Sequence, residues 1–392
     1  MKQPLNPAMA GTFPPPVMQA RRWLDGVHFS KERPLINVSQ AAPVAPPPPA
    51  LRSAIAEAAL HDDSAHLYGP VLGLADLRAE VAEQWTAAYG GSVAADQVAI
   101  TSGCNQAFAA AIATLAGNRD EVIIPAPWYF NHKMWLDMQG IKTIVLDTGP
   151  DLLPDPERAA ALITPRSRAI VLVTPNNPGG VEYPAKLVRA FFELARKHDL
   201  ALILDETYRD FDSRTGAPHD LFSTEGWQDT LIQLYSFSKA FRLTGHRVGT
   251  LIAGARRLAE VEKFLDTVTI CPNQLGQRAA LWGLRNLQDW LSGERDEILR
   301  RRAAMVEGFA ALDGWSLLGA GAYFAYVEHP FATPSDKLAR ALVSEAGVLL
   351  LPGTMFRPTG DAVALRQLRI AFANIDAGGI DTLFQRLAAF RA

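Results

Sequence analysis

The sequence predicts an α/β protein whose core is a mostly parallel, seven-stranded sheet with helices on both faces. Seven short apolar runs follow one another along the chain: QVAITSG, EVIIPAP, KTIVLDT, AIVLVTP, ALILDE, LIQLYSFS and VGTLIAG. Most are too short for helices, are rich in Val and Ile, and lack strict polar alternation, as expected of strands buried on both faces. Helical segments such as NQAFAAAIATLAG and AKLVRAFFELARKH separate several of them, and this alternation favours a parallel sheet.

Composition indicates an ordinary soluble protein. The 392 residues suffice for two domains, with 48% hydrophobic and 20% charged residues. The formal net charge of -3 gives no basic excess for nucleic acid. We expect no membrane partner, because no stretch approaches the roughly 20 apolar residues of a membrane helix. The N-terminus lacks the apolar core of a signal peptide, and Cys104 and Cys271 form no CxxC pair, so we expect a reducing, cytoplasmic location.

The first 50 residues are proline-rich, and we expect them to form an irregular N-terminal arm that contributes to the smaller domain. The run APVAPPPP cannot form regular helix or a central strand, because proline lacks the amide hydrogen. A disordered tail is the alternative. An arm packed on the body is favoured, since INVSQ, just before this run, is typical of a short strand.

Two further units are predicted, a large domain over residues 51–285 and a small C-terminal α+β domain over 286–392. In the large domain, LADLRAEVAEQW has the apolar spacing of an amphipathic helix. Residues from about 275 to 312 are expected to be largely helical and to link the two units. The small domain has strand candidates in GAYFAYVEHP, GVLLLPGTMF and LRIAFAN, and the last helix is expected in IDTLFQRLAAF.

Three strand ends carry residues suited to one ligand, because ligands of such sheets bind outside the carboxyl ends of the strands. TSGCNQAF is a glycine turn before a helix, which can bind an anion, although an ordinary turn explains it equally well. The aromatic side chains of PAPWYFNH could stack on a planar ring, but packing against the adjoining helix explains that segment better when it is taken alone. In TPNNPGG, Asn177 could bond a ring substituent, with Pro178 fixing its position, or simply form a turn.

The fourth strand end places Asp205 directly after four apolar residues. A carboxylate there is poorly solvated and needs a positive partner. A protonated pyridine nitrogen is one such partner. A helix N-cap or a structural salt bridge is the alternative, and without context it is the better explanation.

The most informative segment is SFSKAFRLTGHRVG. Lys239 follows an apolar strand, Ser236 and Ser238 flank it, and Arg247 comes eight residues later. A partly buried lysine has a lowered pKa and becomes a nucleophile toward carbonyls. Serine hydroxyls and an arginine fork suit a phosphate dianion. A surface lysine beside a serine-rich turn is the alternative, and Arg247 weakens it.

Taken together, these segments resemble the class I/II aminotransferases, which are pyridoxal-phosphate enzymes of fold type I. The segments HLYGPVLGLADLR, TSGCNQAF, TPNNPGG, DETY, SFSKAFRLTGHRVG and LRIAFAN occur in the family's order between about Ile36 and Phe372. Several weak signals in the right order are stronger than any one of them. The resemblance implies a fold type I large domain, pyridoxal 5'-phosphate as cofactor, an amino acid and a 2-oxo acid as substrates, and a homodimer.

The resemblance also implies roles for individual residues. Lys239 would hold the cofactor as a Schiff base and carry the proton, and Asp205 would pair with the pyridinium nitrogen. Arg369 would bind the substrate α-carboxylate, with Arg366 as the competing choice. The other implied contacts are Tyr208 and Asn177 to the phenolic oxygen; Ser236, Ser238, Arg247 and the turn of Gly103, Cys104 and Asn105 to the phosphate; Tyr129 or Trp128 to the ring face; and Tyr68 to the phosphate of a partner subunit. No metal site is predicted.

The N-terminal pocket segment departs from the family. The chain has Ala41 and Ala42 where the family often has a glycine, and Ala42 is expected to touch the substrate. The extra methyl groups would either narrow the pocket or move the arm. No clear second basic residue is available for a distal carboxylate, because His132 and Lys133 could equally face solvent. Trp128, Tyr129, Tyr323 and Phe324 suggest an apolar or aromatic-lined pocket, which leaves the amino donor and acceptor undetermined.

The predicted reaction is transfer of an amino group from an L-amino acid to a 2-oxo acid. The same fold and cofactor also support a lyase, such as a carbon–sulfur β-lyase or a decarboxylase, since the sequence does not fix which substrate bond breaks. A non-catalytic regulator is the third possibility. Such a regulator usually carries a DNA-binding domain, and the first 50 residues have no helix-turn-helix pattern and no basic cluster.

Overall fold

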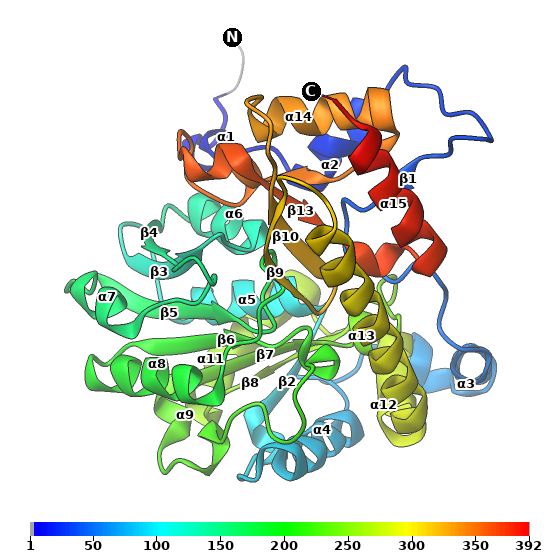
Figure 1. The fold of residues 1–392 in the computed structure, drawn as a ribbon. Helices are drawn as coiled ribbons and strands as arrows, with labels where there is room; N and C mark the ends of the chain where they lie inside the picture. The colour runs from blue at the N-terminus through cyan, green and yellow to red at the C-terminus, as the bar shows by residue number, and fades with distance from the viewer. Residues whose placement is uncertain (1–3, 392) are drawn as a thin grey trace.

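All seven apolar runs form strands of one sheet in the computed structural model, which describes residues 4–391 (Figure 1). The strand order is β2-β8-β7-β6-β5-β3-β4. Strand bounds are β2 (Val98–Thr101), β3 (Glu121–Ala126), β4 (Lys142–Asp147), β5 (Ser167–Val173), β6 (Ala201–Asp205), β7 (Leu231–Ser236) and β8 (Gly249–Ile252). Neighbours are parallel from β4 to β7, and only β8 runs antiparallel, to both β2 and β7. The predicted mostly parallel sheet is therefore confirmed.

Helices cover both faces of this sheet, because successive strand residues point to opposite sides. Leu202 and Leu204 of β6 pack in a cluster with side chains of α4 (Ala75–Tyr89), α8 (Ala185–Lys197) and α12 (Gln274–Asn286). Ile203, between them, packs with α5 (Cys104–Ala113), α6 (Phe130–Met138) and α11 (Ala255–Thr269). Each such fully buried side chain contributes about 1.5–3 kcal/mol, and both faces must be apolar, which is why the strands show no alternation.

A second, smaller unit lies above the sheet in Figure 1 and contains a four-stranded antiparallel sheet of order β12-β13-β10-β9. Its strands are β9 (Ser316–Gly321), β10 (Phe324–Glu328), β12 (Leu351–Pro352) and β13 (Gln367–Ile370), with helices α13 (Gln288–Ala310), α14 (Ser335–Ala341) and α15 (Ala377–Ala389). Strand β9 was not predicted, because SLLGAG has the small residues of a loop. In LRIAFAN only the first residues are strand, and Phe372–Asn374 form a short 3-10 turn.

The N-terminal arm is more regular than predicted. Helices α1 (Pro7–Gly11) and α2 (Pro16–Arg21) correct the expectation of irregular structure. Both begin at a proline, which is tolerated there because the first turn of a helix does not use its amide hydrogens. The predicted strand in INVSQ is confirmed as β1 (Ile36–Asn37), which pairs with β11 (Val348–Leu349).

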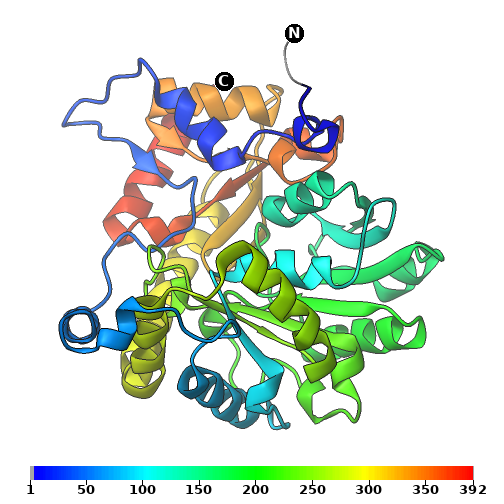
Figure 2. The same ribbon diagram turned by 180° about the vertical axis from the view of Figure 1, so that it is seen from behind.

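The arm packs on the body. Figure 2 shows its blue helices beside the orange and red segments of the smaller unit. Helix α1 contacts α6, and α2 contacts β12. Arg33 donates hydrogen bonds to the backbone oxygens of Ser344 and Glu345. The arm is thereby held against α6 of the large unit and against the smaller unit. None of the helices between residues 4 and 391 has the length and apolarity that crossing a membrane requires.

Candidate active site

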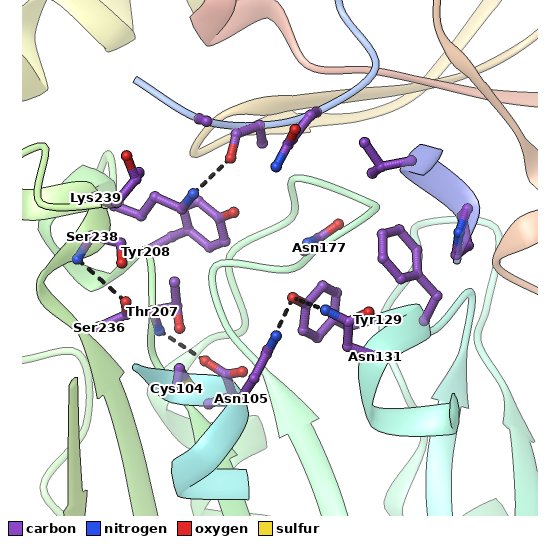
Figure 3. Close-up of a pocket in the computed structure, with 18 of the residues that line it drawn as sticks. Cys104, Asn105, Tyr129, Asn131, Asn177, Thr207, Tyr208, Ser236, Ser238 and Lys239 are labelled. Atoms are coloured by element: carbon purple, nitrogen blue, oxygen red, sulfur yellow. Dashed lines mark hydrogen bonds between the residues drawn. The ribbon is translucent and has the colours of Figure 1, made fainter. Parts of the chain in front are cut away.

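One cavity of about 490 Å³ lies where the carboxyl ends of β5, β6 and β7 meet the N-terminal arm (Figure 3). Side chains that the sequence placed in one site do converge here. Those lining the cavity are Ala41, Ala42, Cys104, Asn105, Tyr129, Asn177, Asp205, Tyr208, Ser236, Ser238, Lys239, Arg247 and Arg369. The site therefore forms at the edge that a parallel sheet makes available for ligands.

Several predicted residues lie elsewhere. Trp128 does not line the cavity; its side chain is buried in the apolar cluster on the α5 and α6 side of the sheet. Consecutive residues of an extended segment face opposite ways, so only Tyr129 of this pair reaches the cavity. Tyr323 and Phe324 also miss it, and their rings pack against Tyr208 at 5.4 and 5.2 Å between centroids.

Three more predicted residues, Arg366, Tyr68 and Gly103, lie off the cavity, for different reasons. Arg366 is exposed and donates to the backbone oxygen of His329, whereas Arg369 on β13 lines the cavity. Tyr68 is 81% exposed and lies outside this chain's own cavity. Gly103 sits behind Arg247 rather than in the lining.

Asp205 ends β6 and is 2% exposed. Its Oδ1 accepts a hydrogen bond from the Thr207 backbone at 3.0 Å, and its Oδ2 lies 3.2 Å from His132 Nε2. Burial alone raises the pKa of Asp205, but His132 and Thr207 outweigh it and hold that pKa below its usual value. Asp205 is therefore a buried carboxylate that can accept a hydrogen bond from a protonated nitrogen of a ligand in the cavity.

His132 is the partner that sequence reasoning left open. It is buried, and its ring stacks on Phe108 with 3.9 Å between centroids. The available signal was its position three residues after Tyr129 at the start of α6, since residues three apart lie on one face of a helix. Lys133, on another face, pairs with Asp137 instead.

Lys239 lies in the short helix α10 (Phe237–Ala240) that follows β7. Its Nζ donates a hydrogen bond to the backbone oxygen of Ala41 at 2.6 Å. Burial, and then the positive charges of Arg247 and Arg369, lower the pKa of Lys239 to about 7. A large fraction of the amine is therefore neutral near neutral pH, which is the form that attacks carbonyl carbon.

An anion cradle lies beside Lys239. Arg247 Nη1 donates to Ser238 Oγ at 3.3 Å, and the Ser238 amide donates to Ser236 Oγ at 3.3 Å. Gly103 has φ +85°, and a Cβ there would come within 2.3 Å of the Arg247 guanidinium. Helix α5 begins at the next residue, so its free amide hydrogens face the same place. This donor set fits a phosphate dianion.

Arg369 is a buried cation that also lines the cavity. It is 2% exposed, and burial lowers its pKa to about 10, so it remains charged. Nη1 donates to Asn177 Oδ1 at 3.0 Å, and Nη2 donates to the backbone oxygen of Ser39. Nε has no hydrogen-bond partner among the described residues. A buried guanidinium with only neutral acceptors is costly, and a carboxylate would relieve that cost.

Asn374 was missed by sequence reasoning. Its side chain bonds the backbone of Asn37, Gln40 and Ala42, and so fixes the segment that faces Lys239. No local pattern indicates these contacts, because they join residues more than 330 positions apart in the chain.

The cavity thus holds a lysine with a lowered pKa beside an anion cradle, together with a buried carboxylate and a buried arginine. Residues 33–387 match the family model described as aminotransferase class I and II. The chain belongs to this family.

Named relatives agree with that assignment. The chain is 30% identical over 306 residues to a probable aspartate/prephenate aminotransferase of Thermus aquaticus, covering 75% of this chain and 77% of that protein. It is 31% identical to an arginine–pyruvate transaminase of Pseudomonas aeruginosa, with 74% and 75% covered. The solved structure of Thermus thermophilus aspartate aminotransferase with maleate superposes with a TM-score of 0.88 at 25% identity, covering 99% of each chain. The protein is an aminotransferase of the pyridoxal-phosphate-dependent type.

Proposed function

We propose that Lys239 holds pyridoxal phosphate covalently as a Schiff base and that Arg369 binds the α-carboxylate of an L-amino acid or a 2-oxo acid. One observation carries the proposal. A lysine with a pKa of about 7 shares one cavity with a buried carboxylate, Asp205, and a phosphate cradle around Arg247. No other lysine of the described chain lines that cavity.

The remaining contacts follow from position around the cavity. Asp205 would face the ring nitrogen, and Tyr129 would lie on the ring face. Asn177 and Tyr208 would bond the phenolic oxygen. Burial raises the pKa of Tyr208, so its hydroxyl stays protonated and can donate. When bound, pyridoxal phosphate supplies an electrophilic carbonyl carbon and a ring that withdraws electrons from the substrate Cα.

The chain's own residues then orient the substrate and move one proton. Arg369 fixes the α-carboxylate through its planar fork, which limits rotation about Cα. Lys239 Nζ takes the Cα proton as a general base and later returns it as a general acid. Asp205, kept ionised by His132, stabilises positive charge at the ring nitrogen throughout.

Transamination is tested by a half-reaction without an acceptor. Purified holoenzyme mixed with single amino acids should convert its cofactor stoichiometrically to the aminated form and release the 2-oxo acid with the same carbon skeleton. Absorbance and mass spectrometry follow the two products. Release of pyruvate and ammonia over many turnovers without an acceptor would instead establish the lyase.

Replacing Arg369 with lysine should raise KM for amino acids by about 10- to 100-fold, because a point charge cannot reproduce a two-pronged carboxylate contact. Steady-state kinetics measures the effect. The matched control is Arg366→Lys, which makes the same change three residues away and off the cavity. An equal rise of KM in the two variants would reject Arg369 as the residue that binds the α-carboxylate.

We also propose a homodimer in a reducing, cytoplasmic location. Five large apolar side chains are exposed on two neighbouring segments: Leu60, Leu67, Tyr68, Val268 and Ile270. A hydrogen bond of 3.4 Å from the Gly69 amide to Cys271 Sγ joins those segments. A second copy would cover this apolar surface and bring Tyr68 toward the phosphate of its neighbour. Both cysteines are free thiols, which fits a reducing environment.

A further inference from the structure

We infer that Arg21 binds an acidic group at the far end of the substrate side chain, so that the preferred substrates are amino acids and 2-oxo acids with two carboxylates. The inference rests on the proposed function, because it requires the α-carboxylate at Arg369 and the cofactor at Lys239. It assigns the second basic residue for a distal carboxylate, which the sequence alone did not reveal.

Three basic side chains meet on one three-residue segment of the N-terminal arm. Arg369 Nη2 donates to the Ser39 backbone oxygen, Arg21 Nη2 donates to Gln40 Oε1 at 2.7 Å, and Lys239 Nζ donates to the Ala41 backbone oxygen at 2.6 Å. All three basic residues, and Gln40 and Ala41, line the same cavity. Arg21 therefore approaches the site from α2, next to the groups that would bind the reacting part of the substrate.

Every acceptor in this arrangement is neutral. A carboxylate offers a guanidinium a full opposite charge and two acceptor oxygens in matching geometry, whereas an amide or carbonyl oxygen offers only a dipole. A carboxylate entering the cavity would therefore replace an amide or carbonyl oxygen as the partner of each guanidinium. For Arg21 the exchange requires only that the Gln40 side chain turn aside, because that contact joins two exposed side chains.

A balance of charges in the cavity points the same way. The lining carries four basic residues, Arg21, Lys239, Arg247 and Arg369, and one carboxylate, Asp205. In the proposed complex, Asp205 faces the ring nitrogen, Arg247 faces the phosphate, Lys239 is joined to the cofactor and Arg369 faces the α-carboxylate. Arg21 alone remains without an anion, since it makes no ion pair with any described carboxylate. A second carboxylate on the substrate completes the balance.

An apolar substrate side chain is the competing occupant. Val17 and Met18 of α2 and Phe130 of α6 also line the cavity and could contact it. Such a side chain would leave Arg21 hydrogen-bonded only to Gln40, and the charge of Arg21 would contribute nothing to its binding. The two possibilities therefore differ in one measurable quantity, the preference for an acid over its uncharged isostere.

The test compares L-glutamate with L-glutamine and L-aspartate with L-asparagine, pairs that differ in charge but scarcely in shape. In the full-length holoenzyme, Arg21→Gln should lower kcat/KM for the acids by about 10- to 100-fold and leave that for the amides unchanged. Arg21→Lys should retain part of the preference, because it keeps the charge. Arg22→Gln is the matched control: Arg22 is the neighbouring exposed arginine and does not line the cavity.

Binding of unreactive acids gives a second readout that does not depend on turnover. Calorimetric titration should show that Arg21→Gln weakens succinate but not butyrate, which has one carboxylate and the same number of carbons. If the ratio of kcat/KM for the acid to kcat/KM for the amide is the same in the wild type and in Arg21→Gln, the inference is overturned. Transamination of alanine or phenylalanine would then show that the proposed function still stands. Failure of the wild type to transaminate any amino acid would reject the proposed function itself.

Discussion

Replacing Lys239 with alanine is expected to abolish covalent attachment of the cofactor and to lower multiple-turnover transamination by at least about 10³-fold. The physical reason is that Lys239 combines two tasks that no neighbour can take over. Its Nζ is the only lysine amine of the described chain in the cavity, and its pKa of about 7 makes it both a nucleophile and a base near neutral pH. Arginine cannot substitute, because a guanidinium does not lose its proton in proteins.

Borohydride reduction followed by mass spectrometry measures the covalent adduct directly. The wild type should gain one cofactor mass on the peptide that contains Lys239, and both Lys239→Ala and Lys239→Arg should gain none. Lys263→Ala is the control, since that lysine is exposed and pairs with Glu260 on α11. In the wild type, cofactor capture should quicken as pH rises through about 7, because deprotonation creates the attacking amine. Retention of the adduct in Lys239→Ala, or an inflection near pH 10, would contradict the assignment.

Replacing Asp205 with asparagine should slow exchange of the substrate α-proton by on the order of 10²–10³-fold, the range found when one preorganised electrostatic group is removed. The amide keeps the shape of the side chain but loses the charge that holds the ring nitrogen protonated. Asp205 is buried beside His132, so water cannot restore that charge. Loss of α-deuterium from a labelled amino acid, followed by NMR, measures the rate.

Carboxylate binding separates this role from general damage to the fold. Succinate affinity should be little changed in Asp205→Asn, because Arg369 contacts Asn177 and Ser39 rather than Asp205. Asp229→Asn, an exposed change elsewhere in the large unit, should alter neither quantity. An unchanged exchange rate in Asp205→Asn would exclude the proposed role, and parallel losses of exchange and affinity would indicate a structural one.

The sheet and the residues at the carboxyl ends of its strands could be predicted because they depend on local sequence signals. Apolar runs without alternation indicate strands buried on both faces, and parallel strands bring their carboxyl ends to one edge. Asp205 and Lys239 each come at the end of such a run, so the sequence predicted that their side chains lie close together. The arm was predicted less well. Its proline-rich composition was interpreted as irregular structure, although Pro7 and Pro16 begin α1 and α2.

By itself, the sequence determined the sheet, the side on which the site forms, and the lysine, carboxylate and arginine types that the chemistry needs. The sequence preferred Tyr129 to Trp128 and Arg369 to Arg366 but left the second of each pair open, and the tertiary structure places only Tyr129 and Arg369 at the cavity. The tertiary structure also placed Arg21 at the cavity. Local periodicity indicates which residues share a face of a strand or helix, whereas packing between segments distant in the chain decides whether one side chain reaches the cavity.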